Sequence, residues 1–179
     1  MSTKAVIYKS KYGFTKKYAE WISSDLKADL YQLSEITGRA LDKYSTIVYG
    51  GGLYVNKLNG INDFLKYQRR LIDKKICIFT CGLSDTGNEK GTERMKSAII
   101  KKIPDYLIEN VKIFHLRGGV RYSELNFLDN LMIKFVEKML KNAKPEDLPP
   151  EQQELAAVIG KDFDFSDREK IKPIIDCMK

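Results

Sequence analysis

The chain has 179 residues, of which 43% are hydrophobic and 31% charged, which is the composition of an ordinary folded domain in water. No apolar run approaches the roughly 20 residues of a membrane-spanning helix, and the polar start leads directly into an apolar segment, which argues against a cleaved signal peptide. The formal net charge of +7 is the unusual bulk property, and it favours anionic partners.

Apolar segments alternate with helix-period patterns along the chain. The segments predicted as strands are 4–9, 29–33, 46–50, 75–80 and 111–116. The segments predicted as helices are 15–27, 61–72, 95–103, 125–140 and 166–178. We expect Pro104 to end the third helix and Pro173 to kink the last one, whereas 144–154, with three prolines, is predicted as an exposed loop. This alternation predicts one α/β domain over residues 1–179, with a parallel sheet covered by helices on both faces.

The stretch between the first strand and its helix, residues 10–15, has the composition of an anion-binding turn. Backbone N–H groups at a helix N-terminus have no intrahelical partners, and the helix dipole favours negative charge there. Ser10 and Thr15 add hydroxyl groups, and Gly13 permits a backbone conformation that a Cβ would block. The turn therefore predicts a phosphate site. The alternative is a turn capped by Thr15 that binds nothing.

Three more loops follow strands at the same edge of the sheet, namely 50–56, 81–88 and 118–122. Ligands of an open parallel sheet bind beyond the carboxyl ends of its strands. Each of these loops carries glycine at or just past the strand, which lets a flat ligand lie against the backbone. For any one of these loops, the glycine is explained by a tight turn of the chain as it leaves the strand. Together with the turn at 10–15, they meet the needs of a flavin mononucleotide.

Several other kinds of site find no support in the sequence. The single histidine, His115, falls inside the fifth strand, so we interpret it as a packed residue and discount Ser-His-Asp catalysis. No cysteine–histidine cluster has the spacing of metal ligands, and the three cysteines, without paired spacing, suggest reduced thiols in the cytoplasm. Residues 8–10 offer no carboxylates for a phosphoacceptor receiver, and dispersed lysines argue against a nucleic-acid partner.

The turn Ser10-x-x-Gly13-x-Thr15 resembles the phosphate-binding turn of flavodoxins. Three later stretches, 50–54, 117–122 (Arg-Gly-Gly-Val-Arg-Tyr) and 129–139 (Asp-x-x-Met-Ile-Lys-x-x-x-Lys-Met), resemble the flavodoxin-type protoporphyrinogen oxidases, which pass electrons to menaquinone. The resemblance implies a flavodoxin-like, doubly wound sheet of five parallel strands in the order 2-1-3-4-5. It also implies an FMN-dependent, quinone-linked oxidoreductase that acts on an anionic tetrapyrrole.

The resemblance also implies which residues bind FMN. The phosphate would lie on the N–H groups of 11–16, and the ring between the loops 51–56 and 81–86. The implied cofactor-binding residues are Ser10, Lys11, Tyr12, Gly13, Phe14, Thr15, Gly51, Gly52, Leu53, Tyr54, Cys81, Gly82, Leu83 and Ser84. Tyr54 would stack on the ring, unless it is only a buried or capping tyrosine. Cys81 would be a small neutral wall, because no basic residue adjoins it. No side chain is expected to act as a nucleophile.

Arg121 and Tyr122 are the residues expected to contact substrate, with Arg121 bonding a carboxylate unless it is a structural arginine. The apolar stripe of helix 125–142 favours packing on the sheet, or else a face that touches an anionic bilayer at the inner side of the membrane and reaches a quinone there. The alternative function is a flavodoxin-like electron shuttle with a redox-protein partner. Shuttle flavodoxins are strongly acidic, however, and this chain is basic.

Overall fold

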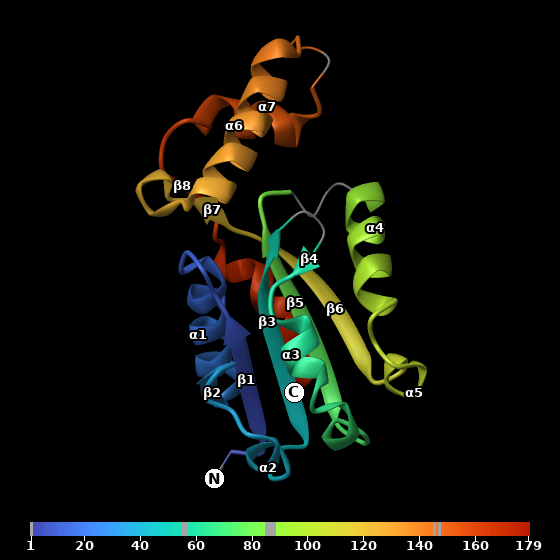
Figure 1. Ribbon diagram of the computed structural model, residues 1–179. Helices are drawn as coiled ribbons and strands as arrows, with labels where there is room; N and C mark the ends of the chain where they lie inside the picture. Colours follow the sequence, from blue (N-terminus) through green and yellow to red (C-terminus); the bar gives the residue numbers. More distant parts are fainter. Residues whose placement is uncertain (1, 55–56, 85–88, 145, 147) are drawn as a thin grey trace.

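The computed structural model describes residues 2–54, 57–84, 89–144, 146 and 148–179 (Figure 1). Its main sheet contains five parallel strands in the spatial order β2-β1-β3-β5-β6. Their bounds are Asp29–Gln32 (β2), Lys4–Lys9 (β1), Thr46–Tyr54 (β3), Lys75–Gly82 (β5) and Val111–Arg117 (β6). Numbered among the five parallel strands alone, this is the predicted order 2-1-3-4-5, so the doubly wound fold is confirmed. A short strand β4 (Lys57–Leu58) pairs antiparallel with β3.

The three central strands, β1, β3 and β5, are buried on both faces of the sheet, which explains their nearly continuous apolar runs. On one face Ile7, Tyr49 and Ile78 pack against helices, and on the other face Val6 and Val48 do so. The alternation follows from the two-residue period of a strand. Full burial of each such side chain contributes roughly 1.5–3 kcal/mol, so the sheet carries much of the stability.

Helices cover both faces of the sheet (Figure 1). One face carries α1 (Phe14–Leu26), η4 (Arg168–Ile171) and α8 (Lys172–Met178). The elements over the other face are α2 (Gly38–Leu41), α3 (Ile61–Leu65), η1 (Gln68–Arg70), α4 (Glu89–Ile100) and α5 (Asp105–Ile108).

Three strands extend further than their apolar patterns predict. β3 continues through Gly50, Gly51 and Gly52, which pair with Phe79, Thr80 and Cys81 of β5. The backbone ladder needs no side chain, so hydrogen bonding continues after the apolar pattern has ended. The consequence is that the predicted ligand loops begin farther along the chain, at the very edge of the sheet.

Residues 119–165, which we name the cap, form a separate layer beyond the carboxyl ends of the strands (Figure 1). Its elements are β7 (Gly119–Val120), η2 (Tyr122–Glu124), α6 (Phe127–Asn142), α7 (Pro150–Val158) and β8 (Phe163–Asp164). β7 and β8 pair antiparallel and close its base. The expectation that helix 125–142 packs on the sheet is therefore wrong, since α6 stands in the cap with much of its apolar face exposed.

Prolines account for most of the other differences between the predicted and the observed helices. The predicted loop 144–154 contains the start of α7, because Pro150 occupies the first turn, where no N–H donor is needed. The closing helix is divided into η4 and α8, with Pro173 in the first turn of α8 rather than at a kink. Within the described ranges, no helix has both the length and the apolar content to cross a bilayer.

Candidate functional site

The turn after β1 has the geometry of an anion site. Gly13 is the N-cap residue of α1 and has φ +88°, a conformation that favours glycine. Its N–H donates to Ser10 Oγ at 3.1 Å, which shapes the turn. No side chain caps α1 and no acidic residue lies in its first turn, so the helix N-terminus stays electropositive. The alternative of a cap at Thr15 is wrong, because Thr15 is buried inside the first turn.

Three other loops meet this turn, as the sequence predicts. A cavity of about 40 Å³ joins the turn to the ends of β3, β5 and β6. Its lining residues are Ser10, Tyr12, Phe14, Thr15, Gly52, Tyr54, Cys81, Gly82, Gly118 and Gly119. A Cβ on Gly118 would lie 2.8 Å from Cys81 Sγ, so glycine is needed there for the loops to approach one another.

A second cavity, which we name the α6 cavity, adjoins the first and shares Tyr12, Tyr54 and Gly82 with it. It has a volume of about 190 Å³ and is mostly apolar. Its remaining lining residues are Leu53, Leu83, Val120, Leu125, Asp129, Met132, Ile133 and Val136. The wall from α6 was not predicted. Its signal was the apolar stripe, which we assigned to the sheet or to the membrane but not to a ligand site.

The chain matches the flavodoxin domain family over residues 5–147, which is more than half of its length. It belongs to that family. A protein of Methanocaldococcus jannaschii described as uncharacterized is 26% identical over 146 residues, which cover 76% of this chain and 97% of the relative. Members of the flavodoxin family are flavin-binding redox proteins, so flavin is the cofactor to test against this site.

Two solved structures share the flavodoxin fold. Oxidised flavodoxin 2 from Bacillus cereus is 20% identical and has a TM-score of 0.46, with 76% of this chain and 99% of that chain covered. A flavodoxin from the domain Archaea is 12% identical and has a TM-score of 0.43, with 87% and 97% covered. At these identities the likeness concerns the fold alone.

The residues around the first cavity fit a flavin. Tyr54 folds back over Gly52, with its ring 2.8 Å from the position of a Gly52 Cβ, and meets Tyr12 edge to face at 6.5 Å. Burial raises the pKa of Tyr54, so its phenol is neutral and its ring is an apolar surface. The ring partly fills the space between the loops, so a flat ligand would stack on it or displace it.

Cys81 is the neutral wall that the sequence suggests. Burial raises the pKa of its thiol to about 12, although a hydrogen bond with Thr15 opposes the shift. A thiol with this pKa is protonated at neutral pH and is a poor nucleophile. It leaves the carboxyl end of β5 without charge at this position.

Arg121 lies at the turn after β1 and does not line the α6 cavity. Its Nη1 is 3.7 Å from the position of a Gly13 Cβ, and its guanidinium lies 5.4 Å from the centre of the Phe14 ring. It also pairs with Glu124 at 3.1 Å. Tyr122 lies inside the cap, where its hydroxyl accepts a hydrogen bond from the Gly160 N–H at 2.6 Å. The structure thus separates the two residues that were predicted to contact substrate together.

A polar cluster ties the turn to α6. Asp129 accepts hydrogen bonds from Lys11 and from the Tyr12 hydroxyl, and its own N–H donates to Asn126 at 2.8 Å. Partial burial opposes ionisation of Asp129, but the bonds from Lys11 and Tyr12 outweigh it and lower the pKa. Lys11 therefore serves the cap contact rather than the lining of either cavity.

His115 is buried and packed, as the sequence suggests. Its Nε2 lies 3.0 Å from the Ser84 carbonyl, which can only accept, so Nε2 carries the proton. Nδ1 lies 2.5 Å from the Thr80 hydroxyl oxygen, within hydrogen-bond distance. His115 thereby holds the Ser84 carbonyl in place.

Ser84 and Gly51 are two of the residues predicted to bind the cofactor. Gly51 pairs its backbone with Thr80 of β5. Neither Ser84 nor Gly51 lines the two cavities. The predicted loop positions 55–56 and 85–88 lie outside the described residues.

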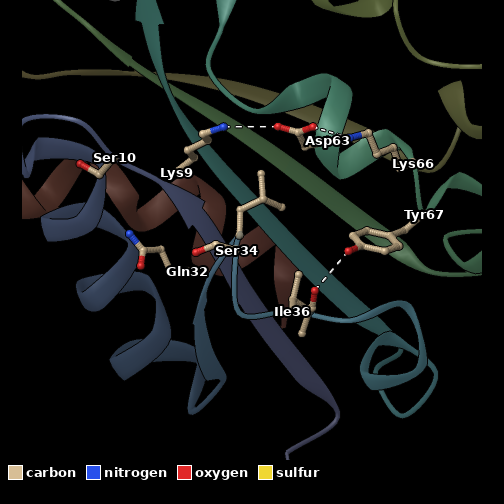
Figure 2. A pocket seen from close by; sticks show the side chains of 9 residues that line it. Lys9, Ser10, Gln32, Ser34, Ile36, Asp63, Lys66 and Tyr67 are labelled. Carbon is tan, nitrogen blue, oxygen red and sulfur yellow. Dashed lines mark hydrogen bonds and ion pairs between the residues drawn. The ribbon is translucent and has the colours of Figure 1, made fainter.

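A third cavity, of about 390 Å³, lies on the other side of Ser10 and was not predicted. Figure 2 shows Lys9 and Lys66 reaching Asp63 from opposite sides, at 3.3 and 2.7 Å. Hydrogen bonds from Lys66 and then Lys9 lower the pKa of Asp63. The two lysines thus share one carboxylate beside the phosphate turn, and all three side chains are substantially exposed to solvent.

Proposed function

We propose that the protein is an FMN-dependent oxidoreductase that passes electrons to a quinone, as do the flavodoxin-type protoporphyrinogen oxidases that it resembles. The observation that supports this proposal is the α6 cavity. It places apolar walls beside the predicted ring site, between Leu53 and Leu83 on the loops and Met132 and Val136 on α6. Such a cavity suits an apolar ring, which a protein that only shuttles electrons between proteins does not need to bind.

FMN is the flavin that suits the turn. The first-turn N–H groups of α1 would bind its phosphate, and the Arg121 guanidinium beside Gly13 would offset the charge. This position favours a phosphate partner for Arg121 over the substrate carboxylate expected from the sequence. FMN supplies hydride or electron transfer at its N5 atom.

The protein side chains would orient the reactants and exclude water. Tyr54 and Leu53 would hold the ring on one side, and the backbone of Gly82 and Leu83 on the other. Neutral Cys81 keeps charge away from this edge. The α6 cavity, at about 190 Å³, is smaller than the roughly 300 Å³ of typical ligand pockets. It therefore suits one ring of a quinone or of a tetrapyrrole, with the anionic groups of the substrate left outside.

The net charge of +7 supports an anionic substrate such as protoporphyrinogen. It would also repel the basic partners on which acidic shuttle flavodoxins dock. Membership of the flavodoxin family nevertheless keeps an electron shuttle with a redox-protein partner as the second candidate.

Anaerobic turnover of protoporphyrinogen with a water-soluble menaquinone analogue tests the proposal. We expect the protein to bind one FMN and to oxidise the porphyrinogen with the quinone as acceptor. FMN binding without turnover, together with rapid one-electron reduction by a ferredoxin-type reductase, would establish the shuttle instead. Failure to take up FMN would overturn both functions.

A further inference from the structure

Six of the nine large hydrophobic side chains that are exposed among the described residues lie on α6. They are Phe127, Leu128, Leu131, Met132, Phe135 and Met139, with exposed fractions of 82, 68, 60, 44, 67 and 51%. We name these six residues the α6 face. Folded proteins rarely expose so many large apolar side chains together unless the surface meets a partner.

The α6 face is one continuous strip. At about 100° per residue, its six members fall within a sector of about 140° around the helix. Ile133 and Leu140 point the other way and are buried, so α6 already has an inner side. Figure 1 shows α6 in the cap, beyond the ends of the strands and away from the sheet.

Positive charge lines one border of this face. Lys134, Lys138 and Lys141 are exposed and cluster within about 60° of one another around the helix. The acidic residues of α6 are already engaged, Asp129 by Lys11 and Glu137 by Lys141 at 2.6 Å. Within the described part of the chain, Lys134 and Lys138 form no ion pair. The border therefore offers uncompensated ammonium groups beside the apolar strip.

We propose that α6 lies flat in the interface of an anionic lipid bilayer, with the α6 face toward the acyl chains and the lysines among the headgroups. An amphipathic helix with a cationic border has this preference, because apolar burial and headgroup attraction act together. None of the described helices crosses a bilayer, so the contact is peripheral.

A second copy of the chain fits this face less well than a lipid surface does. When two helices pair antiparallel across a two-fold axis, the same border of each helix comes together. Lys134 and Lys138 of one copy would then face the same residues of the other, and like charges repel. An anionic headgroup layer instead neutralises them.

This lipid contact rests on the proposed function in one respect, namely that it would give a quinone in the bilayer access to the flavin. The inner side of α6 lines the α6 cavity through Ile133 and Val136, and Met132, at the border of the α6 face, lines it as well. A helix that lies in the interface would bring this cavity to the lipid surface. A quinone dissolved in the bilayer would then reach the flavin edge without crossing water.

Vesicle flotation of the full chain tests the docking. We expect binding to phosphatidylglycerol vesicles that weakens as salt rises, and much weaker binding to phosphatidylcholine vesicles. The double variant Leu131→Ser/Phe135→Ser should lower the partition coefficient at least about tenfold. The matched control Ile72→Ser/Ile100→Ser removes two exposed apolar side chains elsewhere and should leave it unchanged. Lys134→Gln/Lys138→Gln should lower binding to phosphatidylglycerol alone, by about tenfold or more.

Two further measurements separate this proposal from the function. FMN binding and turnover with the water-soluble quinone analogue, without vesicles, should be the same in Leu131→Ser/Phe135→Ser as in the wild type. If the wild type turns over but does not float with vesicles, the docking is wrong and the function stands. If it floats but does not turn over, the docking stands and the function is wrong. A dimer by light scattering that Leu131→Ser/Phe135→Ser dissolves, without vesicle binding, would assign the face to a second copy.

Discussion

Gly13 shows how one backbone angle prepares an anion site. A side chain at φ +88° costs roughly 1–2 kcal/mol, although its Cβ would be only in ordinary van der Waals contact with the Arg121 guanidinium. We expect Gly13→Ala to lower the free energy of unfolding by about that amount and to weaken FMN binding in a fluorescence titration. Gly160→Ala is the matched control, because Gly160 also has a positive φ but lies in the cap. Equal losses of FMN affinity in both variants would contradict a special role for the turn.

Arg121 lies where a phosphate would be bound, and the flavin can be chosen to test this. A charge-assisted hydrogen bond contributes roughly 1.5–3 kcal/mol, so Arg121→Gln should weaken FMN binding about tenfold or more. Riboflavin lacks the phosphate, and its affinity should be unchanged in the same titration. An equal loss for both flavins would place the guanidinium at the ring or the substrate instead.

His115 of β6 connects Thr80 of β5 with Ser84 in the loop that follows β5. Its loss leaves the Ser84 carbonyl and the Thr80 hydroxyl without their ring partners, which costs roughly 1–3 kcal/mol. We expect His115→Gln to lower the urea midpoint while the FMN-loaded protein keeps its turnover number. Loss of turnover in a folded, FMN-saturated variant would show that the packed interpretation of His115 is wrong.

At the scale of elements, the only carboxylate that the described residues place between α6 and the turn at 10–15 is that of Asp129, which acts beside a hydrogen bond from the Asn126 N–H to the Tyr12 hydroxyl. The pKa of Asp129 is lowered in the folded protein, so its contribution is present above the ordinary aspartate range near ~3.9. It is lost as the pH falls through the lower folded pKa. We expect hydrogen exchange in the first turn of α6 to speed up across that acidic window. In the Asp129→Asn variant, the amides of this turn should exchange fast at every pH. If the acceleration at acidic pH persisted in this variant, it would come from another titrating group.

The start of α7 at Pro150 and the outward face of α6 are two features that the sequence patterns did not determine. An apolar stripe at helical spacing predicts α6 correctly as a helix. The same stripe is compatible with a sheet, a cavity or a lipid surface, because each of these covers apolar groups. Which one covers the stripe depends on where the cap stands, and periodicity carries no information about that.

At the scale of the whole molecule, the cap and the sheet are joined by several contacts. Lys17 of α1 pairs with Asp164 of β8 at 2.7 Å, and Arg117 of β6 pairs with Glu154 of α7. The prediction of one domain over 1–179 therefore leads us to expect one cooperative unfolding transition. Far-UV circular dichroism, which includes α6 and α7, should follow the fluorescence of Trp21 in α1. A separate early loss of helicity would show that the cap unfolds on its own.

Local chemistry determined the sheet and the phosphate turn. The central strands are continuous apolar runs because both of their faces are buried, and Gly13 and Ser10 act within a few residues of each other in the chain. Tertiary structure alone decided the rest. Asp129 reaches Lys11, and Arg121 reaches Gly13, across more than a hundred residues, which no local pattern encodes. The exposure of α6 was decided in the same way, because a helix cannot specify from its own period which of its apolar sides the rest of the chain will cover.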